Sequence, residues 1–179
     1  MFEKAFVNSA CEKAIKAIAA GDKNALTVIY DKMHRLIYST AWAVLNNHAD
    51  AEDALQNTLC EVLRCAPAYS GGSARAWILS IARNQALNMI RKRKNEALID
   101  EEPKTALSSP ETEFIYLEAL SKLSENEREA VMLRVYCRCR HKEAAEILGV
   151  SVAAAEKLYQ RGIKKLRDYY KEDAPDEKN

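Results

Sequence analysis

The last third of the chain constrains the fold most, because signals for helix starts and helix ends divide it into three helices. Ser124 and Glu127 form an S-x-x-E capping box, which predicts the start of the first helix. A short second helix is expected from about 141 to 148, and Gly149 suits the left-handed backbone that ends many helices. Ser151 caps a third, longer helix. This order predicts a helix-turn-helix, a motif that places one helix in the major groove of DNA.

The rest of the chain also has the pattern of helices. Apolar residues recur every three or four positions in four segments, which predict helices at about 9–20, 24–45, 50–65 and 74–94. We therefore expect an all-α protein made of two small helical domains. The expected divisions are a first domain at 1–95, a flexible acidic linker at 96–111, a helix-turn-helix domain at 112–171 and a disordered tail at 172–179.

The charges of the chain are unevenly distributed, although its net charge is only +1. Residues 83–94 hold five basic side chains and no acidic one, whereas residues 95–113 hold six acidic side chains against one lysine. A local basic stripe can bind phosphates while a neighbouring acidic segment balances the total charge. The distribution therefore permits nucleic-acid binding that the net charge hides.

The cysteines, histidines and apolar runs argue against several classes of protein. The five cysteines are an odd number in a chain without a signal-peptide pattern, which indicates reduced thiols. Cys137, Cys139 and His141 lack the spacing and the second ligand pair of a structural zinc site, so we expect no metal and no cofactor. No apolar run approaches the roughly 20 residues that span a membrane, so we expect no membrane insertion and a cytoplasmic protein. No nucleophile–base pair emerges, which favours a protein that is not an enzyme.

A basic helix and the loop before it form the first candidate nucleic-acid site. Asn84, Asn88 and Arg91 follow one another at i, i+4 and i+7, so amides that read base edges lie beside a cation. The loop AYSGGS offers Tyr69 for stacking on an unpaired base and glycines for close backbone approach. A solvated helix end and an ordinary loop are the alternative interpretation. The candidate residues are Tyr69, Ser70, Gly71, Ser73, Arg75, Arg83, Asn84, Asn88, Arg91, Lys92 and Arg93.

The third helix of the helix-turn-helix carries the second candidate site. Its apolar residues repeat at three or four positions, so we expect Val152, Ala155 and Leu158 to pack inward. The side chains left on the outside mix small, charged and amide groups, which suits contact with a DNA groove and backbone. They are Ser151, Ala153, Ala154, Glu156, Lys157, Gln160, Arg161 and Lys164.

Both halves resemble the extracytoplasmic-function (ECF) group of sigma factors, the promoter-recognition subunits of bacterial RNA polymerase. The segment DAEDALQNTLCEVL resembles the family's DAEDLVQE-type helix in region two, and RAWILSIARNQALNMIRKRK resembles its RAWL-x-x-IARN basic stretch. LSENEREAVMLR followed by EAAEILGVS resembles the start of region four. The resemblance covers about 10–95 and 112–168, and distinct motifs in the right order are more specific than one motif alone.

The resemblance implies a specificity subunit whose partners are core RNA polymerase and promoter DNA. Region two would contact the polymerase and open the minus-ten element, while region four would bind the minus-thirty-five element as duplex. An anti-sigma factor is a further candidate partner in this group. The resemblance assigns the acidic helix to the polymerase, and Asp50 is also expected to cap that helix. The polymerase-binding residues would be Asp50, Asp53, Gln56 and Asn57.

The recognition helix departs from the family pattern. Where T-V-K-S-R-L is usual, residues 154–159 are AAEKLY, so Glu156 replaces a cation and Leu158 replaces an arginine. Glutamate accepts a hydrogen bond from cytosine but repels phosphate. Two alternatives therefore stay open. One is a helix-turn-helix regulator with an N-terminal sensor or dimerisation domain, and the other is a degenerate sigma-like adapter that binds polymerase or another partner without reading DNA.

Overall fold

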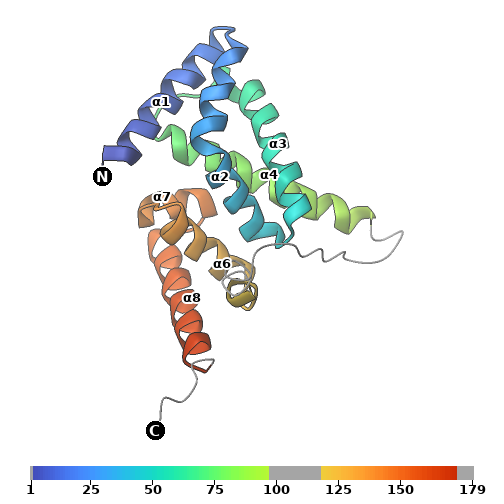
Figure 1. The fold of residues 1–179 in the computed structure, drawn as a ribbon, viewed down its shortest axis with the longest axis vertical. Helices are drawn as coiled ribbons and strands as arrows, with labels where there is room; N and C mark the ends of the chain where they lie inside the picture. Colours follow the sequence, from blue (N-terminus) through green and yellow to red (C-terminus); the bar gives the residue numbers. More distant parts are fainter. Residues whose placement is uncertain (1, 97–117, 173–179) are drawn as a thin grey trace. The chain divides into compact units, whose positions relative to one another are not determined.

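The computed structural model describes residues 2–96 and 118–172, and every regular element in these ranges is helical (Figure 1). The elements divide into two compact units, which we call the N-terminal unit and the C-terminal unit. The predicted all-α fold with two helical units is confirmed. Most of the predicted linker (97–111) and of the predicted tail (173–179) lies outside the described residues.

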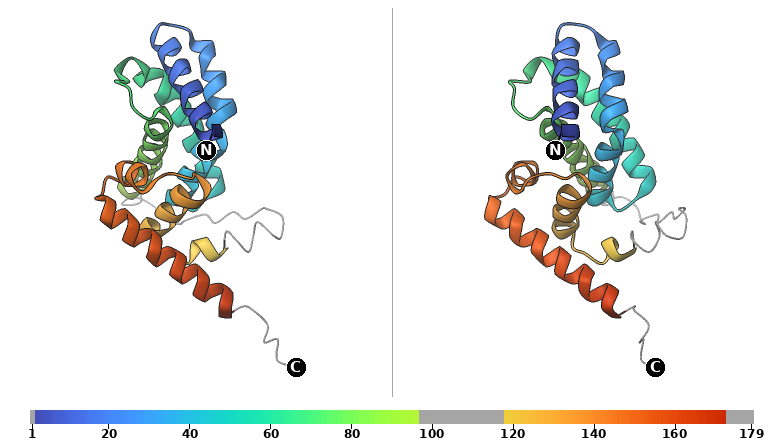
Figure 2. Two further views of the ribbon diagram at one scale, coloured as in Figure 1. Left: turned by 90° about the vertical axis from the view of Figure 1, so that its left-hand side faces the viewer. Right: turned by 60° about the vertical axis from the view of Figure 1, so that its left-hand side comes forward.

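Four helices build the N-terminal unit within the described residues 2–96. In this unit α2 packs against α3 and α4, and α1 lies beside α2 in all views (Figures 1 and 2). Single 3₁₀ turns precede α2 and follow α3, at Lys23–Ala25 and Ala66–Ala68. The helices are α1 (Phe2–Ala19), α2 (Leu26–Leu45), α3 (His48–Cys65) and α4 (Ala74–Glu96).

The centre of the N-terminal core comes from one face of α2. Ile29, Met33 and Ile37 recur at i, i+4 and i+8 and are completely buried, as the helical periodicity predicts. Ile78 on α4 is also completely buried, and the small Ala54 on α3 lets neighbouring helices approach closely. Burial of a large apolar side chain stabilises a fold by about 1.5–3 kcal/mol, so this core fixes α3 and α4, which carry the candidate sites.

The start of α3 differs from the prediction. Asn47 is the N-cap residue, because its backbone is extended and its side-chain oxygen accepts a hydrogen bond from the Asp50 backbone N–H at 3.1 Å. The prediction that Asp50 caps this helix is therefore wrong. Asn and Asp are equally good cap residues, so local sequence does not decide between two of them three positions apart. Asp50 instead lies in the first turn of α3 and is buried.

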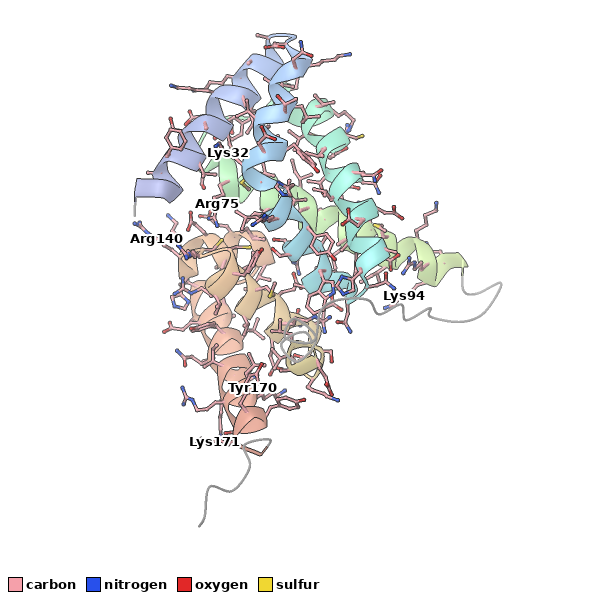
Figure 3. All side chains as sticks on the ribbon, in the orientation of Figure 1. Lys32, Arg75, Lys94, Arg140, Tyr170 and Lys171 are labelled. Atoms are coloured by element: carbon pink, nitrogen blue, oxygen red, sulfur yellow. The ribbon has the colours of Figure 1, made fainter. Side chains whose placement is uncertain are left out.

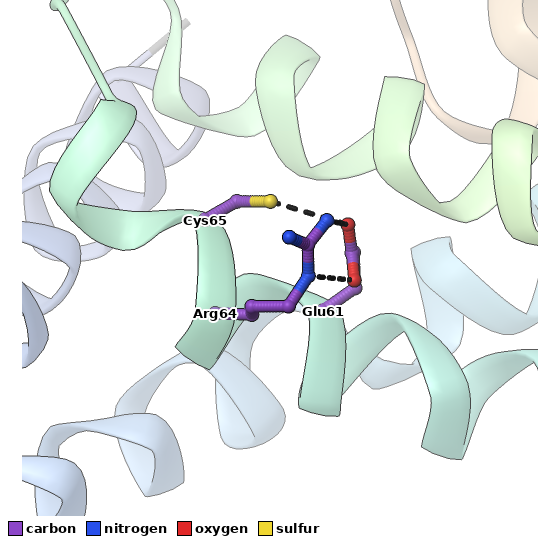
Figure 4. Close-up of polar contacts among 3 residues, drawn as sticks. All are labelled: Glu61, Arg64 and Cys65. Atoms are coloured by element: carbon purple, nitrogen blue, oxygen red, sulfur yellow. Dashed lines mark hydrogen bonds and ion pairs between the residues drawn. The ribbon is translucent and has the colours of Figure 1, made fainter.

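The last turn of α3 is tied together by Glu61 (Figure 4). Arg64 Nε donates to Glu61 Oε2 at 2.9 Å, and the Cys65 thiol donates to Glu61 Oε1 at 3.2 Å. The hydrogen bonds from Arg64 and then from Cys65 lower the pKa of Glu61 to about 2. The same contact with Glu61, followed by burial, raises the pKa of the Cys65 thiol. Cys65 is therefore held in its protonated, weakly nucleophilic form.

The C-terminal unit has the predicted order of helices. Ser124 precedes α6, and its backbone N–H donates to Glu127 Oε2 at 3.1 Å, as expected of the capping box. Gly149 ends α7 with φ of 69°, and Ser151 Oγ accepts from the backbone N–H of Ala154 at 3.2 Å at the start of α8. The elements are α6 (Glu125–Val131), a π-helical turn (Met132–Tyr136), α7 (His141–Leu148) and α8 (Val152–Glu172).

A close contact between α6 and α8 fixes the position of α8. A Cβ atom at Gly162 would lie 2.6 Å from Val131 Cγ2, so the two helices meet where α8 has no side chain. Beside this point Lys165 Nζ donates to Glu127 Oε2 at 2.7 Å. Burial alone would raise the pKa of Glu127, but the hydrogen bonds from Lys165 and Ser124 outweigh it and lower the pKa. Ala155 packs on the same side of α8 and is buried.

Candidate nucleic-acid and polymerase interfaces

Three polar side chains form an exposed line along α4. Asn84, Asn88 and Arg91 are all exposed, and Arg91 Nη1 donates to Asn88 Oδ1 at 3.4 Å. Arg83 is half-buried beside this line. The predicted spacing therefore puts two amides and one guanidinium on one surface. Amides can read base edges and a guanidinium can neutralise phosphate, so the line has the chemistry of a nucleic-acid contact.

The loop before α4 is held by its own contacts. The Tyr69 hydroxyl donates to the Gly72 carbonyl at 2.9 Å, and the Tyr69 ring lies 5.2 Å from the Trp77 ring at 59°. Gly71 and Gly72 have φ of 105° and 92°, a conformation that glycine adopts without strain. Ser73 Oγ accepts from the backbone N–H of Ala76 at 3.2 Å, so its hydroxyl caps α4. Ser70 and Gly71 stay exposed at the tip.

Arg75 is placed differently from the rest of the predicted set. It lies at the opposite end of α4 from Lys94 (Figure 3), and it is only 4% exposed. Its backbone N–H donates to Asn8 Oδ1 on α1 at 3.1 Å. Burial raises the pKa of the Cys11 thiol, also on α1, and the positive charge of Arg75 offsets part of this rise. The prediction of an accessible Arg75 is therefore wrong. The reason is the packing of α1 over the start of α4, which the sequence around Arg75 does not reveal.

Asp50 and Arg93 form an ion pair in which both terminal nitrogens of the guanidinium donate to the carboxylate. Asp50 is 6% exposed, whereas the Arg93 side chain is 57% exposed. The pair joins the first turn of α3 to the last turns of α4. The resemblance implies that Asp50 contacts the polymerase, and the basic helix predicts that Arg93 contacts DNA. This ion pair has to break before either charge can bind another molecule.

A groove of about 430 Å³ runs between α3 and α4. Its lining mixes residues that the resemblance assigns to polymerase with residues of the basic helix that are predicted to bind DNA. Lys92 is the clearest case, because it lies across the groove from the exposed acidic helix rather than on the line that contains Arg91. Neighbouring residues on a helix point about 100° apart, which separates Lys92 from Arg91. The lining residues are Asp53, Gln56, Asn57, Met89, Lys92 and Arg93.

The outer face of α8 carries the predicted recognition residues. Glu156, Lys157, Gln160 and the rest of the predicted set are exposed, except for the half-buried Ala154. The remaining members are Ser151, Ala153, Arg161 and Lys164. The face combines short side chains near its N-terminal end with cations farther along, which suits insertion of the N-terminal turns into a major groove.

Val152 is the exception on α8, because the sequence predicts that it packs inward and the structure leaves it 46% exposed. Apolar spacing failed here since Val152 is the first residue of the helix, one turn before Ala155 makes the buried contact. Arg134, on the turn after α6, donates to the Cys139 carbonyl and lies 5.5 Å from the Tyr159 ring centre. Both of these contacts of the Arg134 guanidinium are therefore within the C-terminal unit.

Within residues 2–96 and 118–172, no three His, Cys, Asp or Glu side chains gather into a set that could hold a metal ion. Cys137 and Cys139 are buried and His141 is half-buried. The same described residues contain no helix that is long and apolar enough to cross a membrane.

Comparison with known proteins identifies the family. Two family models match the chain, one for Sigma-70 region 2 at residues 29–96 and one for Sigma-70 region 4 at residues 113–166. The RNA polymerase sigma factor CarQ of Myxococcus xanthus is 31% identical over 134 residues, which cover 70% of this chain and 77% of CarQ. The ECF RNA polymerase sigma factor SigE of Mycolicibacterium smegmatis is 30% identical over 167 residues. The chain is an ECF sigma factor of the sigma-70 family. The match with SigE covers 84% of this chain, and the chain spans 65% of the length of SigE.

This ECF sigma factor also shares its fold with solved structures. CnrH, solved in complex with the cytosolic domain of CnrY, matches with a TM-score of 0.72 and 22% identity, over 92% of this chain and 99% of CnrH. The sigma factor RpoE of Bartonella quintana, solved with the anti-sigma factor NepR, matches with a TM-score of 0.66 and 24% identity. The match covers 79% of this chain and 93% of RpoE.

The sequence analysis did not predict two features of this ECF sigma factor, namely the groove and the ion pair between Asp50 and the groove-lining Arg93. The i, i+3, i+4 spacing of Met89, Lys92 and Arg93 is the signal that predicts a shared face for these three residues. Asp50 and Arg93 are 43 residues apart, so their pairing follows only from the packing of α3 on α4.

Proposed function

We propose that this ECF sigma factor directs core RNA polymerase to a set of promoters and opens them. The N-terminal unit would hold the separated minus-ten strand, and the C-terminal unit would bind the minus-thirty-five element as duplex. The observation that carries the proposal is the exposed line of Asn84, Asn88 and Arg91 on α4. The protein acts as a non-catalytic specificity subunit in the cytoplasm, where core polymerase and promoters meet.

The N-terminal unit recognises the minus-ten element through α4 and the loop before it. Amides at positions 84 and 88 read the edges of unpaired bases, and Arg91 neutralises the strand's phosphate. The exposed tip at Ser70 and Gly71 receives a base turned out of the stack. Capture of such a base costs a few kcal/mol, and stacking on an aromatic ring such as Tyr69 returns about 1–3 kcal/mol.

The acidic face of α3 binds core polymerase. Asp53, Gln56 and Asn57 are exposed on consecutive turns and line the groove, so a basic or amide-rich helix of the polymerase can lie along them. Asp50 and Arg93 act on this surface by fixing the separation of α3 and α4 through their ion pair. We therefore assign these two residues a positioning role.

We propose that the division of labour follows the domain limits expected from the sequence. We propose a region-2 domain at 1–95, a linker at 96–111, a region-4 domain at 112–171 and a tail at 172–179. Supporting this division, the family models match 29–96 and 113–166, and the two compact units separate between Ala106 and Leu107. A tether of this kind lets each unit find its own promoter element.

An anti-sigma factor is a further proposed partner. RpoE of Bartonella quintana, which has the same fold, was solved with the anti-sigma factor NepR. Apolar side chains that stay exposed on this chain, such as Phe6 at 65% and Tyr30 at 47%, offer surface for a protein partner. Such a protein would compete with core polymerase for the free sigma factor.

Run-off transcription with core polymerase over a library of genomic promoters tests the proposal. The wild-type chain should give discrete start sites that core polymerase alone does not use. The double variant Asn84→Ala/Arg91→Ala should lower the yield at these sites by at least tenfold, because it removes a base contact and a phosphate contact. Lys23→Ala is the matched control, since Lys23 is an exposed cation in the turn before α2, away from the proposed surfaces.

A wild-type chain that neither binds core polymerase nor changes start-site choice would contradict the proposal. Binding to polymerase without any change in start site would point to the adapter function instead. A stable dimer that binds a palindromic DNA site in the absence of polymerase would point to a helix-turn-helix regulator.

A further inference from the structure

We propose that Val152 and Glu156 select the sequence of the upstream promoter element, Val152 by contact with a thymine methyl group and Glu156 by accepting a hydrogen bond from a cytosine amino group. The inference rests on the proposed function of the C-terminal unit and assigns that unit a specific base preference. It concerns two residues of α8 that depart from expectation. Val152 was expected to be buried, and Glu156 stands where a cation is usual in the family.

The exposed surface of α8 separates into two lines of different chemistry. Val152, Glu156 and Gln160 follow one another at i, i+4 and i+8, and none of them carries a positive charge. We call this line the base stripe. The cationic stripe follows it around the helix and consists of exposed Lys157, Arg161 and Lys164.

The two stripes match the two kinds of surface that a helix meets in a major groove. The floor of the groove displays base edges and methyl groups, whereas its walls are phosphate. Because each residue turns the helix by about 100°, the buried face with Ala155 and Gly162, the base stripe and the cationic stripe succeed one another around α8. The direction opposite the buried face falls between the two stripes, so a helix whose cationic stripe lies on one phosphate wall turns its base stripe toward the groove floor.

The position of Glu156 makes its charge available to a base. The residues three and four positions away on either side are Val152, Ala153, Tyr159 and Gln160, so no lysine or arginine of α8 can neutralise it as a helix neighbour. Among bases in the major groove, cytosine presents an amino donor that a carboxylate accepts well. A carboxylate this close to phosphate weakens DNA binding unless it accepts a hydrogen bond from such a donor. Glu156 should therefore disfavour binding to sites that lack one.

Val152 supplies the apolar half of the preference. Its side chain is 46% exposed at the first position of α8, the end of a recognition helix that contacts base edges. A thymine methyl is the apolar group available on the groove floor. Four residues of helix advance about 6 Å, and successive bases on a strand are about 3.4 Å apart. The preferred thymine and cytosine should therefore lie about two base pairs apart.

Selection from a promoter library with a randomised upstream element tests the inference, using the full chain with core polymerase and sequencing of the transcribed templates. We expect wild type to enrich a cytosine, with a thymine about two base pairs away, each by about 5- to 150-fold over other bases. Glu156→Gln should move the first preference from cytosine to adenine, because an amide both donates and accepts. Val152→Ser should abolish the thymine preference, while Val152→Thr keeps a methyl group and should retain it.

Lys157→Ala separates base selection from overall affinity. It should lower transcription from all upstream sequences alike, because a phosphate contact carries no base preference. An upstream motif that is enriched by wild type but unchanged by Glu156→Gln and Val152→Ser overturns the inference and leaves the proposed function intact. Start sites chosen with no upstream enrichment overturn the inference and the duplex role of α8. Failure to transcribe any template overturns the proposed function itself.

Discussion

Removal of the Arg93 side chain should destabilise the N-terminal unit, whereas removal of its near neighbour Arg91 should not. Arg93→Ala deletes both donors that the guanidinium provides to Asp50. The carboxylate, which is 6% exposed while the pair is intact, then loses its ion-pair partner. Arg91 is exposed and makes one long hydrogen bond, to Asn88 at 3.4 Å, so its loss costs little in stability.

The size of the effect follows from the position of the pair at the edge of the unit. Breaking a fully buried pair costs about 3–5 kcal/mol, and breaking an exposed one costs about 0–1 kcal/mol. Asp50 is buried but the Arg93 side chain is 57% exposed, so water can reach the vacated side of the carboxylate. The N-terminus of α3 also offsets part of the loss, by about 0.3–1 kcal/mol. We expect about 2 kcal/mol for Arg93→Ala, and less than about 0.5 kcal/mol for Arg91→Ala.

Urea unfolding followed by tryptophan fluorescence measures this difference selectively, because Trp42 and Trp77 are the only tryptophans and both belong to the N-terminal unit. In a double-mutant cycle with Asp50→Ala, the two substitutions should show a coupling energy of about 1–2 kcal/mol. If Arg93→Ala lowers the free energy of unfolding no more than Arg91→Ala does, the ion pair does not hold α3 to α4 and its positioning role is refuted.

Three further predictions concern other contacts. Gly162→Ala should destabilise the C-terminal unit by about 1–2 kcal/mol, because overpacking against Val131 exceeds the gain in helix propensity. Thermal unfolding followed by circular dichroism measures the change, and an unchanged or higher Tm would contradict the close contact. The pKa of Glu127 is lowered, so its contribution to the free energy of unfolding is fully present above the ordinary pKa of 4.5. This contribution is lost as the pH falls through the folded-state pKa, so Glu127→Gln should flatten the acid-side decline in stability. In mass-spectrometric alkylation at pH 8, exposed Cys60 should react before Cys65, whose thiol pKa is raised, and equal rates would argue against the bond to Glu61.

Local signals in the sequence were sufficient for the helix-turn-helix. The second helix was expected at 141–148 and is observed at His141–Leu148, with Gly149 in the left-handed cap and Ser151 at the start of α8. These features depend on residues within four positions of one another, and cap and turn preferences operate over that range. The exposed line from Asn84 to Arg91 was predictable for the same reason, because it follows from helical spacing alone.

Features set by packing between distant segments were not predictable in this way. Arg75 is buried because α1 covers the start of α4, and the contact with Asn8 spans 67 positions. Asp50 is the third residue of a helix capped by Asn47, and its carboxylate meets Arg93 from another helix. Val152 has the residue type of a core position, yet the neighbours that would cover it are absent at the first turn of α8 in the described C-terminal unit.

The basic cluster at the end of α4 illustrates how one sequence motif divides into separate functions. Arg91, Lys92 and Arg93 are consecutive, so a sequence pattern treats them as one positive patch. A turn of about 100° per residue places Arg91 on the line with Asn88, Lys92 in the groove beside α3, and Arg93 against Asp50. Alanine substitution of the whole cluster would therefore remove a proposed DNA contact, a cation that lines the groove and a structural ion pair together. Only single substitutions, compared in stability and in transcription, can assign each loss to its cause.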